Sequence, residues 1–172
     1  MKHLTGCLAA GIAAAGIAAA GGAAPAHAQG PAGGARMSAH PVNIAAADMK
    51  WNRMFPELGE KSSEIAILQV DSTTGATRLM IRVPANFHVP RHWHSANETH
   101  TVVSGTFIVE CEGKRATLGP GGFNYMPRKM VHEAWTPADQ GAVLFITVDA
   151  AWDNNWVDGP PKPKDLIGGA RR

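Results

Sequence analysis

Apolar and polar residues alternate through the middle of the chain with the period of a β-strand. Between residues 106 and 111, Thr, Ile and Glu alternate with Phe, Val and Cys, so one face of this stretch would lie on a core. Similar stretches, each ended by a turn signal rich in Gly, Pro, Asp or Ser, cover residues 64–70, 77–83, 98–103, 106–111, 115–118, 123–126, 131–135 and 142–148. No helical period and no internal repeat interrupts them. The pattern predicts one all-β domain, an antiparallel double-sheet sandwich or barrel.

The first 28 residues have a different character from this domain. They combine a short basic start, an uncharged run rich in Ala and Gly from Leu4 to Ala24, and the small residues Ala26 and Ala28 before Gln29. This order is typical of a secretory signal peptide. The run is weakly hydrophobic and no basic cluster follows it, which favours cleavage over a retained anchor. We therefore predict a periplasmic or secreted protein with no membrane segment after cleavage.

The remaining segments flank the predicted barrel on both sides. Residues 29–40 are rich in Gly, Ala and Pro and predict a flexible linker. Residues 41–63 carry enough apolar side chains to pack on the barrel as an arm, although the sequence leaves open whether they form an edge strand. The barrel itself is expected at 64–149. In the tail, 150–172, we expect two tryptophans to pack on the barrel and the proline-rich part to resist regular structure.

Charge and cysteine content narrow the possible partners. The whole chain has 172 residues and a formal net charge of +2, and loss of Lys2 with the signal peptide would leave a net charge of +1. This balance indicates neither a nucleic-acid partner nor an anionic membrane surface. The same cleavage would remove Cys7 and leave Cys111 alone, so no internal disulfide is expected.

Four residues carry the candidate chemistry. His92 and His94 are two apart, so on a strand they would point to the same side, and Glu98 could join them after a tight turn. These donors would then converge from two adjacent strands, and His132 follows much later in the chain. Imidazole nitrogens and a carboxylate oxygen are typical ligands of a divalent transition metal.

At these residues the chain resembles a known family. The spacing His92-x-His94-x3-Glu98-x6-Gly105 resembles the first motif of the cupin superfamily, and Gly121-x5-Pro127-x4-His132 resembles its second. The resemblance implies a single jelly-roll β-barrel with one metal ion inside, bound by His92, His94, Glu98 and His132. It also implies a homodimer.

Three positions depart from the family pattern, none of them a ligand position. Asn86 replaces the Gly that usually begins the first motif, Lys129 replaces a Gly of the second motif, and Thr136 replaces the Asn that often ends it. Asn tolerates unusual backbone angles, whereas Lys129 predicts an ordinary turn conformation.

A divalent ion held by three histidines and one glutamate would keep one or two positions open for water, substrate or O₂. Fe, Mn, Zn, Ni and Cu all accept such a set, so the sequence does not identify the metal. Two further residues are candidates for moving a proton. Strand alternation places His100 on the same face as Glu98, and Tyr125, the only tyrosine, could present a phenol to the substrate.

The leading functional interpretation is an exported mononuclear metal-binding cupin acting on a small-molecule substrate. The metal would serve as a Lewis acid or an O₂-activating centre, in a reaction of the dioxygenase, decarboxylase or isomerase type. Two alternatives stay open. One is a metal-dependent binding or sensing module without turnover, and the other is a metal-free cupin resembling sugar epimerases, in which the histidines would act as acid or base.

Overall fold

The fold consists of two antiparallel sheets packed face to face. A computed structural model describes residues 41–168, so the predicted signal peptide (1–28) and linker (29–40) lie outside the described residues. In this part of the chain no helix is long and apolar enough to cross a bilayer. The three helical segments are the short 3-10 helices Ala46–Asp48 and Pro56–Lys61 and the single turn α1, Pro163–Leu166.

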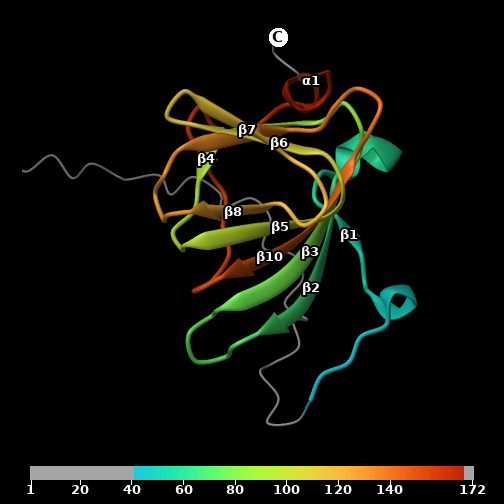
Figure 1. The fold of residues 1–172 in the computed structure, drawn as a ribbon, viewed down its shortest axis with the longest axis vertical. Helices are drawn as coiled ribbons and strands as arrows, with labels where there is room; N and C mark the ends of the chain where they lie inside the picture. Colours follow the sequence, from blue (N-terminus) through green and yellow to red (C-terminus); the bar gives the residue numbers. More distant parts are fainter. Residues whose placement is uncertain (1–40, 169–172) are drawn as a thin grey trace, which may run out of the picture.

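The first sheet has the strand order β1-β2-β3-β10-β5-β8 and the second has the order β11-β4-β9-β6-β7 (Figure 1). The strands of the first sheet are β1 (Asn52–Arg53), β2 (Glu64–Val70), β3 (Thr77–Val83), β5 (Glu98–Gly105), β8 (Phe123–Met126) and β10 (Ala142–Val148). Those of the second are β4 (His88–Trp93), β6 (Phe107–Cys111), β7 (Lys114–Leu118), β9 (His132–Trp135) and β11 (Asn155–Trp156). Sequence neighbours such as β4 and β5 therefore lie in opposite sheets, and the all-β double-sheet prediction is confirmed.

Alternation along the strands builds the core between the two sheets. In β10 every second residue is buried, from Ala142 to Val148, and β3 beside it follows the same rule. Leu79 and Ile146 are paired across these strands, and both are almost completely buried. Burying an aliphatic side chain of this size contributes roughly 1.5–3 kcal/mol. The period-2 pattern thus fixes which face of the sheet looks inward, and this same face carries the candidate site.

All eight predicted strands are present, with ends shifted by no more than two residues. The strand expected to carry His92 and His94, whose bounds the sequence left open because Pro90 interrupts the pattern, is β4, and His94 lies just after its end. A register shift in the pairing of β4 with β9 falls between Val89 and His92, where a proline without an N–H group can be accommodated.

The two flanking segments are more ordered than the sequence suggests. In the arm, β1 pairs with β2, so the arm includes a short edge strand, and Met54 and Phe55 pack against the core. In the tail, the proline-rich residues 159–162 form no helix or strand, as predicted, but a helical turn begins at Pro163. β11 pairs with β4, and α1 buries Leu166 completely. The apolar side chains of both segments are what hold them on the barrel.

Two of the three unusual motif positions have left-handed backbones. Asn86 has φ 57°, as its tolerance of such angles predicts, but Lys129 has φ 63°, so the prediction of an ordinary turn there was wrong. The backbone N–H of Lys129 donates a 2.8 Å hydrogen bond to the carbonyl of His94, and this bond ties the loop to the candidate site. The third position, Thr136, is fully buried and its hydroxyl donates to the carbonyl of Pro84 at 2.6 Å.

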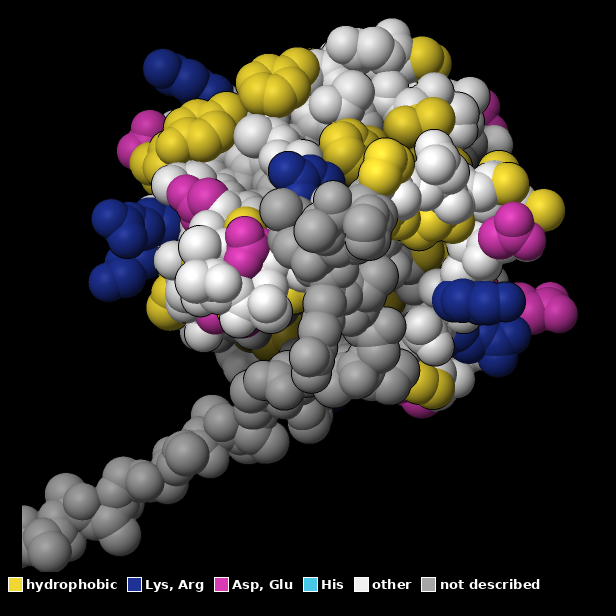
Figure 2. Space-filling view, turned by 90° about the horizontal axis from the view of Figure 1, so that it is seen from below, with side chains coloured by type: hydrophobic (Ala, Val, Ile, Leu, Met, Phe, Trp, Pro, Cys, Tyr) yellow, Lys and Arg dark blue, Asp and Glu magenta, His cyan; other side chains and the backbone are white. Residues whose placement is uncertain are grey.

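The visible surface carries charges of both signs. On the face shown in Figure 2, Lys and Arg side chains are interspersed with Asp and Glu and do not form a patch of one sign. This distribution agrees with the near-balanced charge of the sequence and offers no basic surface for a nucleic acid on that face.

Candidate metal centre

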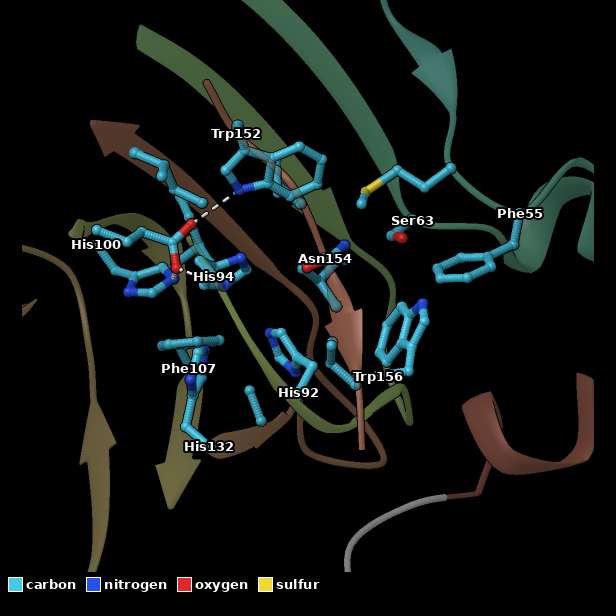
Figure 3. Close-up of a pocket in the computed structure, with 18 residues that line it drawn as sticks. Phe55, Ser63, His92, His94, His100, Phe107, His132, Trp152, Asn154 and Trp156 are labelled. Atoms are coloured by element: carbon cyan, nitrogen blue, oxygen red, sulfur yellow. Dashed lines mark hydrogen bonds and ion pairs between the residues drawn. The ribbon is translucent and has the colours of Figure 1, made fainter. Parts of the chain in front are cut away.

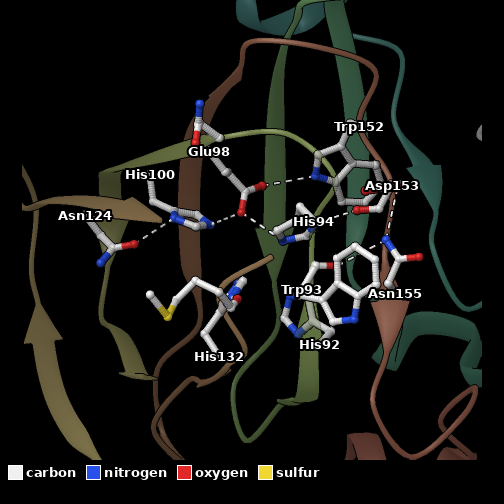
Figure 4. Close-up of polar contacts among 12 residues, drawn as sticks. His92, Trp93, His94, Glu98, His100, Asn124, His132, Trp152, Asp153 and Asn155 are labelled. Atoms are coloured by element: carbon white, nitrogen blue, oxygen red, sulfur yellow. Dashed lines mark hydrogen bonds and ion pairs between the residues drawn. The ribbon is translucent and has the colours of Figure 1, made fainter. Parts of the chain in front are cut away.

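The four predicted ligands come from both sheets. His92 lies near the end of β4 and is paired directly with His132, the first residue of β9, in the second sheet. His94 follows β4, and Glu98 begins β5 in the first sheet. The prediction that adjacent strands carry the donors was therefore wrong for Glu98. The turn 94–97 crosses from one sheet to the other, so the candidate site bridges the two sheets inside the barrel (Figure 4).

The three imidazoles form a compact buried group. One ligand atom from each of His92, His94 and His132 lies within 4.8 Å of the others. The ring centroids are 4.2 Å apart for His92 and His132, 4.9 Å for His92 and His94, and 5.2 Å for His94 and His132. Such spacing allows all three rings to contact one ion. Burying three imidazoles removes each ring from water, which costs free energy. An ion bound by all three rings would offset this cost.

Backbone carbonyls fix the tautomer of each ring. The Nδ1 atom of His92 lies 2.7 Å from the carbonyl of Pro90, and that of His132 lies 3.0 Å from the carbonyl of Met130. The Nδ1 atom of His94 bonds the carbonyl of Asp153. A carbonyl can only accept a hydrogen bond, so Nδ1 must carry the proton and donate it. In the neutral ring this leaves the Nε2 lone pair available to a metal, which is the usual arrangement of histidine ligands.

Burial keeps two of the rings neutral. It lowers the pKa of His92 well below its ordinary value, and the neighbouring imidazoles of His132 and His94 lower it further. Burial also lowers the pKa of His132 to about 4. For His94, burial lowers the pKa, but the charge of Glu98 opposes it and the net pKa is raised. Neutral imidazole is the form that binds metal, so His92 and His132 are ready as ligands at neutral pH.

Glu98 lies beside the histidine group and has one oxygen without a hydrogen bond. Its Oε1 accepts a 3.0 Å bond from Trp152 Nε1. Its Oε2 is 3.0 Å from Nε2 of His94 and 3.2 Å from Nε2 of His100, yet it has no partner in hydrogen-bond geometry among the described residues. Burial raises the pKa of Glu98, but the charges of His100 and His94 lower it by more. The net pKa is therefore well below the ordinary value.

This unsatisfied oxygen tests whether a metal fits. An ionised carboxylate that is only 1% exposed is costly unless its lone pairs are used. Two donors that bind one ion at about 2.1 Å each lie roughly 3 Å apart, which matches the contact between Glu98 Oε2 and His94 Nε2. His92, His94 and His132 with Glu98 are thus a donor set that suits a divalent transition metal.

The two residues proposed to move a proton are placed differently. His100 is buried on the inner face of β5, with Nε2 on Glu98 and Nδ1 3.2 Å from Asn124 Oδ1. Tyr125 is 53% exposed and does not line the cavity, because it is paired with Thr99 on the outer face of β8. The structure therefore brings His100 to the site and leaves Tyr125 outside it, contrary to the orientation the sequence suggested.

A small apolar cavity of about 60 Å³ adjoins the candidate ligands (Figure 3). The apolar walls are formed by Met54, Phe55, Ile81, Val83, Val89, Phe107, Ala134, Leu144, Ile146, Trp152 and Trp156. Sequence reasoning missed the part taken by the tail, which supplies Trp152, Asn154 and Trp156. The two tryptophans were interpreted as packing residues, and only the pairing of β11 with β4 places them over the histidines.

Comparisons with known proteins agree with the sequence motifs. Residues 79–149 match a family model described as a cupin domain. No curated protein matches the chain. The fold is similar to that of the polyketide cyclase RemF from Streptomyces resistomycificus, with 16% identity, a TM-score of 0.58 and coverage of 73% of this chain and 90% of that one.

Two further solved structures have similar folds. The DMSP lyase DddQ from Ruegeria pomeroyi shares 16% identity, with a TM-score of 0.57 and coverage of 72% of this chain and 75% of that one. KdgF from Halomonas sp. shares 19% identity, with a TM-score of 0.51 and coverage of 64% and 94%. At these identities the likeness concerns the fold.

Proposed function

We propose that this chain, which carries a cupin domain at residues 79–149, binds one divalent transition metal and acts on a small molecule in the adjoining cavity. His92, His94 and His132 would hold the ion, with Glu98 as the fourth ligand. The observation that carries the proposal is the preset geometry of the three rings. Each Nδ1 is fixed on a backbone carbonyl, so in the neutral rings the lone pair of each Nε2 can bind an ion within a compact buried group.

The bound ion would supply Lewis-acid or O₂-activating chemistry at its open positions. The protein's own residues set the surroundings. Trp152 Nε1 holds Glu98 by one carboxylate oxygen and leaves the other free to face His94. The aromatic and aliphatic walls exclude water and strengthen electrostatic interactions inside the cavity.

His100 is the residue we assign to proton transfer. It lines the same cavity, contacts Glu98 through Nε2, and is oriented from the other side by Asn124. A histidine in this position can hold or release a proton at Nε2 close to a bound substrate. Tyr125, on the outer face, has no part in this proton transfer.

The open metal position and the acid–base residue define a group of possible reactions. Decarboxylation, isomerisation and dioxygenation all use an open metal position next to an acid–base residue. Among the proteins of similar fold, one is named a cyclase and another a lyase. Those names favour a reaction in which bonds are rearranged or eliminated with proton transfer, so we place such chemistry ahead of O₂ activation.

Elemental analysis tests the proposal directly. The chain should be purified without an immobilised-metal resin and its transition metals quantified, both as isolated and after dialysis against one divalent ion at a time. We expect about one ion per chain in the wild type and almost none when His92, His94 and His132 are all replaced by Gln. His88→Gln is the matched control, because His88 lies outside the cavity, stacked on Trp135, and its loss should leave the metal content unchanged. A wild-type protein that takes up no metal would refute the proposal.

Two further parts of the proposal concern location and assembly. The uncharged run 4–24 and the small residues before Gln29 support export to the periplasm or the medium. Val103, Phe123 and Tyr125 are exposed apolar residues on β5 and on the edge strand β8, and their burial against a second copy would support a homodimer. N-terminal sequencing of the secreted protein and light scattering of the purified chain test these two parts separately.

A further inference from the structure

A second unsatisfied acceptor faces the same cavity. Asn154 lies in the tail between Trp152 and Trp156, and its side chain points into the cavity (Figure 3). Its Oδ1 atom is buried and has no hydrogen-bond partner among the described residues. Leaving a buried amide oxygen unpaired costs about 1–3 kcal/mol, so such an atom calls for an explanation.

The other unsatisfied buried atoms in the described part of the chain do not share this explanation. Glu98 Oε2 faces the histidines and is satisfied by the metal of the proposed function. The indole nitrogens of Trp51 and Trp135 do not line the cavity, and each of those rings is covered by an arginine. Of these atoms, Asn154 Oδ1 is therefore the one that faces the cavity and would still lack a hydrogen-bond partner with a metal bound.

We infer that Asn154 is a ligand-binding residue whose amide oxygen accepts a hydrogen bond from a hydroxyl group of the molecule bound at the metal. This inference rests on the proposed function, since it places the ligand beside His92, His94 and His132. Beside Asn154 the cavity wall is formed by the aromatic rings of Phe55 and Trp156, with Ser63 as a further polar side chain (Figure 3). A ligand with one hydroxyl and a short apolar body fits this surface.

Size and charge define the ligand class more closely. The cavity of about 60 Å³ is less than half the roughly 150 Å³ of an engineered cavity that accepts benzene, so the part of the ligand that it encloses must be smaller than a six-membered ring. Three neutral imidazoles and one carboxylate leave a divalent ion with a net charge of +1, which favours an anionic ligand group. The inferred ligand is a short hydroxycarboxylate whose carboxylate faces the metal and whose hydroxyl reaches Asn154.

The experiment compares three small acids on the Co²⁺-loaded full chain. Acetate offers only the carboxylate, glycolate adds a hydroxyl donor, and methoxyacetate replaces that donor with an ether oxygen that can only accept. Dissociation constants would be measured by calorimetry and by the visible spectrum of Co²⁺, with metal content determined in the same samples. The proteins are the wild type, Asn154→Leu, which keeps a similar volume and removes the acceptor, and the surface control Asn52→Leu. Asn154→Ala serves if the Leu variant does not fold.

We expect glycolate to bind the wild type and Asn52→Leu about tenfold more tightly than acetate or methoxyacetate. In Asn154→Leu this preference should disappear while acetate affinity and Co²⁺ content stay unchanged. If Co²⁺ and acetate bind but glycolate shows no preference, or if the preference survives in the Asn154 variants, the inference is overturned and the proposed function stands. If methoxyacetate shares the preference, the hydroxyl does not donate to Asn154 and the inference is also overturned. A wild type that binds no Co²⁺ overturns both.

Discussion

The strands of the barrel and the tail that crosses its opening contribute to the site in different ways. β4, β5 and β9 with the turn after β4 supply the four candidate ligands, whose positions follow from strand alternation and direct pairing, as for His92 and His132. Residues 152–156 supply no ligand, yet they hold the ligands in place: Trp152 bonds Glu98, and the carbonyl of Asp153 bonds His94. The barrel strands therefore determine which atoms would meet a metal ion, while the tail orients two of those candidate ligands.

The largest effect on metal affinity should come from removing a candidate ligand that the barrel strands supply. Replacing His132 by Ala removes one of three imidazoles and leaves its partners facing an incomplete site. We expect Co²⁺ affinity to fall by at least a hundredfold, measured by competition with a chelator of known affinity. The thermal stabilisation that excess Co²⁺ gives to the wild type should fall in parallel. An unchanged affinity would show that His132 is not a ligand.

The pH dependence of the stability of the metal-free protein tests whether the buried imidazoles of the site are neutral. His92 and His132 have folded pKa values below the unfolded value of 6.5, so below pH 6.5 the unfolded chain binds more protons than the folded one. The free energy of unfolding should therefore decrease as the pH falls from 6.5 to about 4, the pKa of His132. His132 alone accounts for on the order of 3 kcal/mol over this window.

The other two groups of the site act outside the range from pH 6.5 to 4.5. The raised pKa of His94 acts above pH 6.5, and the lowered pKa of Glu98 acts below its ordinary value of 4.5. Urea unfolding at half-unit pH steps is the measurement, and His132→Gln should flatten the slope. A stability that stays level between pH 6.5 and 4.5 in the metal-free wild type would contradict the assignment of neutral buried imidazoles.

A smaller effect is expected from the tail. Trp152→Phe keeps an aromatic wall and removes the N–H that holds Glu98 Oε1. Partners that orient a ligand typically change metal affinity by about 10- to 100-fold, and we expect the lower end because the three histidines remain. Trp156→Phe is the matched control, since Trp156 lines the cavity and contacts His92 only through its ring. Equal affinities for the two variants would mean that the tail acts as a wall only.

The smallest effect should come from Tyr125→Phe, on the outer face of β8. Tyr125 is half exposed and lies away from the cavity, so metal affinity should be unchanged and stability should shift by less than about 0.5 kcal/mol. His100→Gln, on the inner face, should keep the metal but weaken or abolish turnover once a substrate is found. A loss of metal or of turnover in Tyr125→Phe would contradict the placement of Tyr125 outside the site.

The sequence predicted the barrel strands well because their alternation reports burial directly. β10, with every second residue buried, is the clearest case, whereas the bounds of β4 stayed open because Pro90 breaks the period that the prediction needs. The same alternation correctly turned His100 towards Glu98. Tyr125 was proposed from its place before Pro127 and not from alternation, and the face it occupies depends on the register of β8 with β5, where Glu98 meets Met126 and Thr99 meets Tyr125.

Long-range contacts explain what the sequence could not give. The bond between Trp152 and Glu98 joins residues 54 positions apart, and that between His94 and Asp153 joins residues 59 apart. No local period marks such pairs, so the tail looked like a packing segment. Asn154 carries no motif at all and became a candidate only through its buried, unpaired oxygen.

Anomalous diffraction from crystals of the metal-loaded protein tests the central claim most directly. The account predicts a single strong peak at metal-bonding distance from Nε2 of His92, His94 and His132 and from Oε2 of Glu98. A peak elsewhere, or a fully loaded protein with no peak among these four atoms, would contradict it.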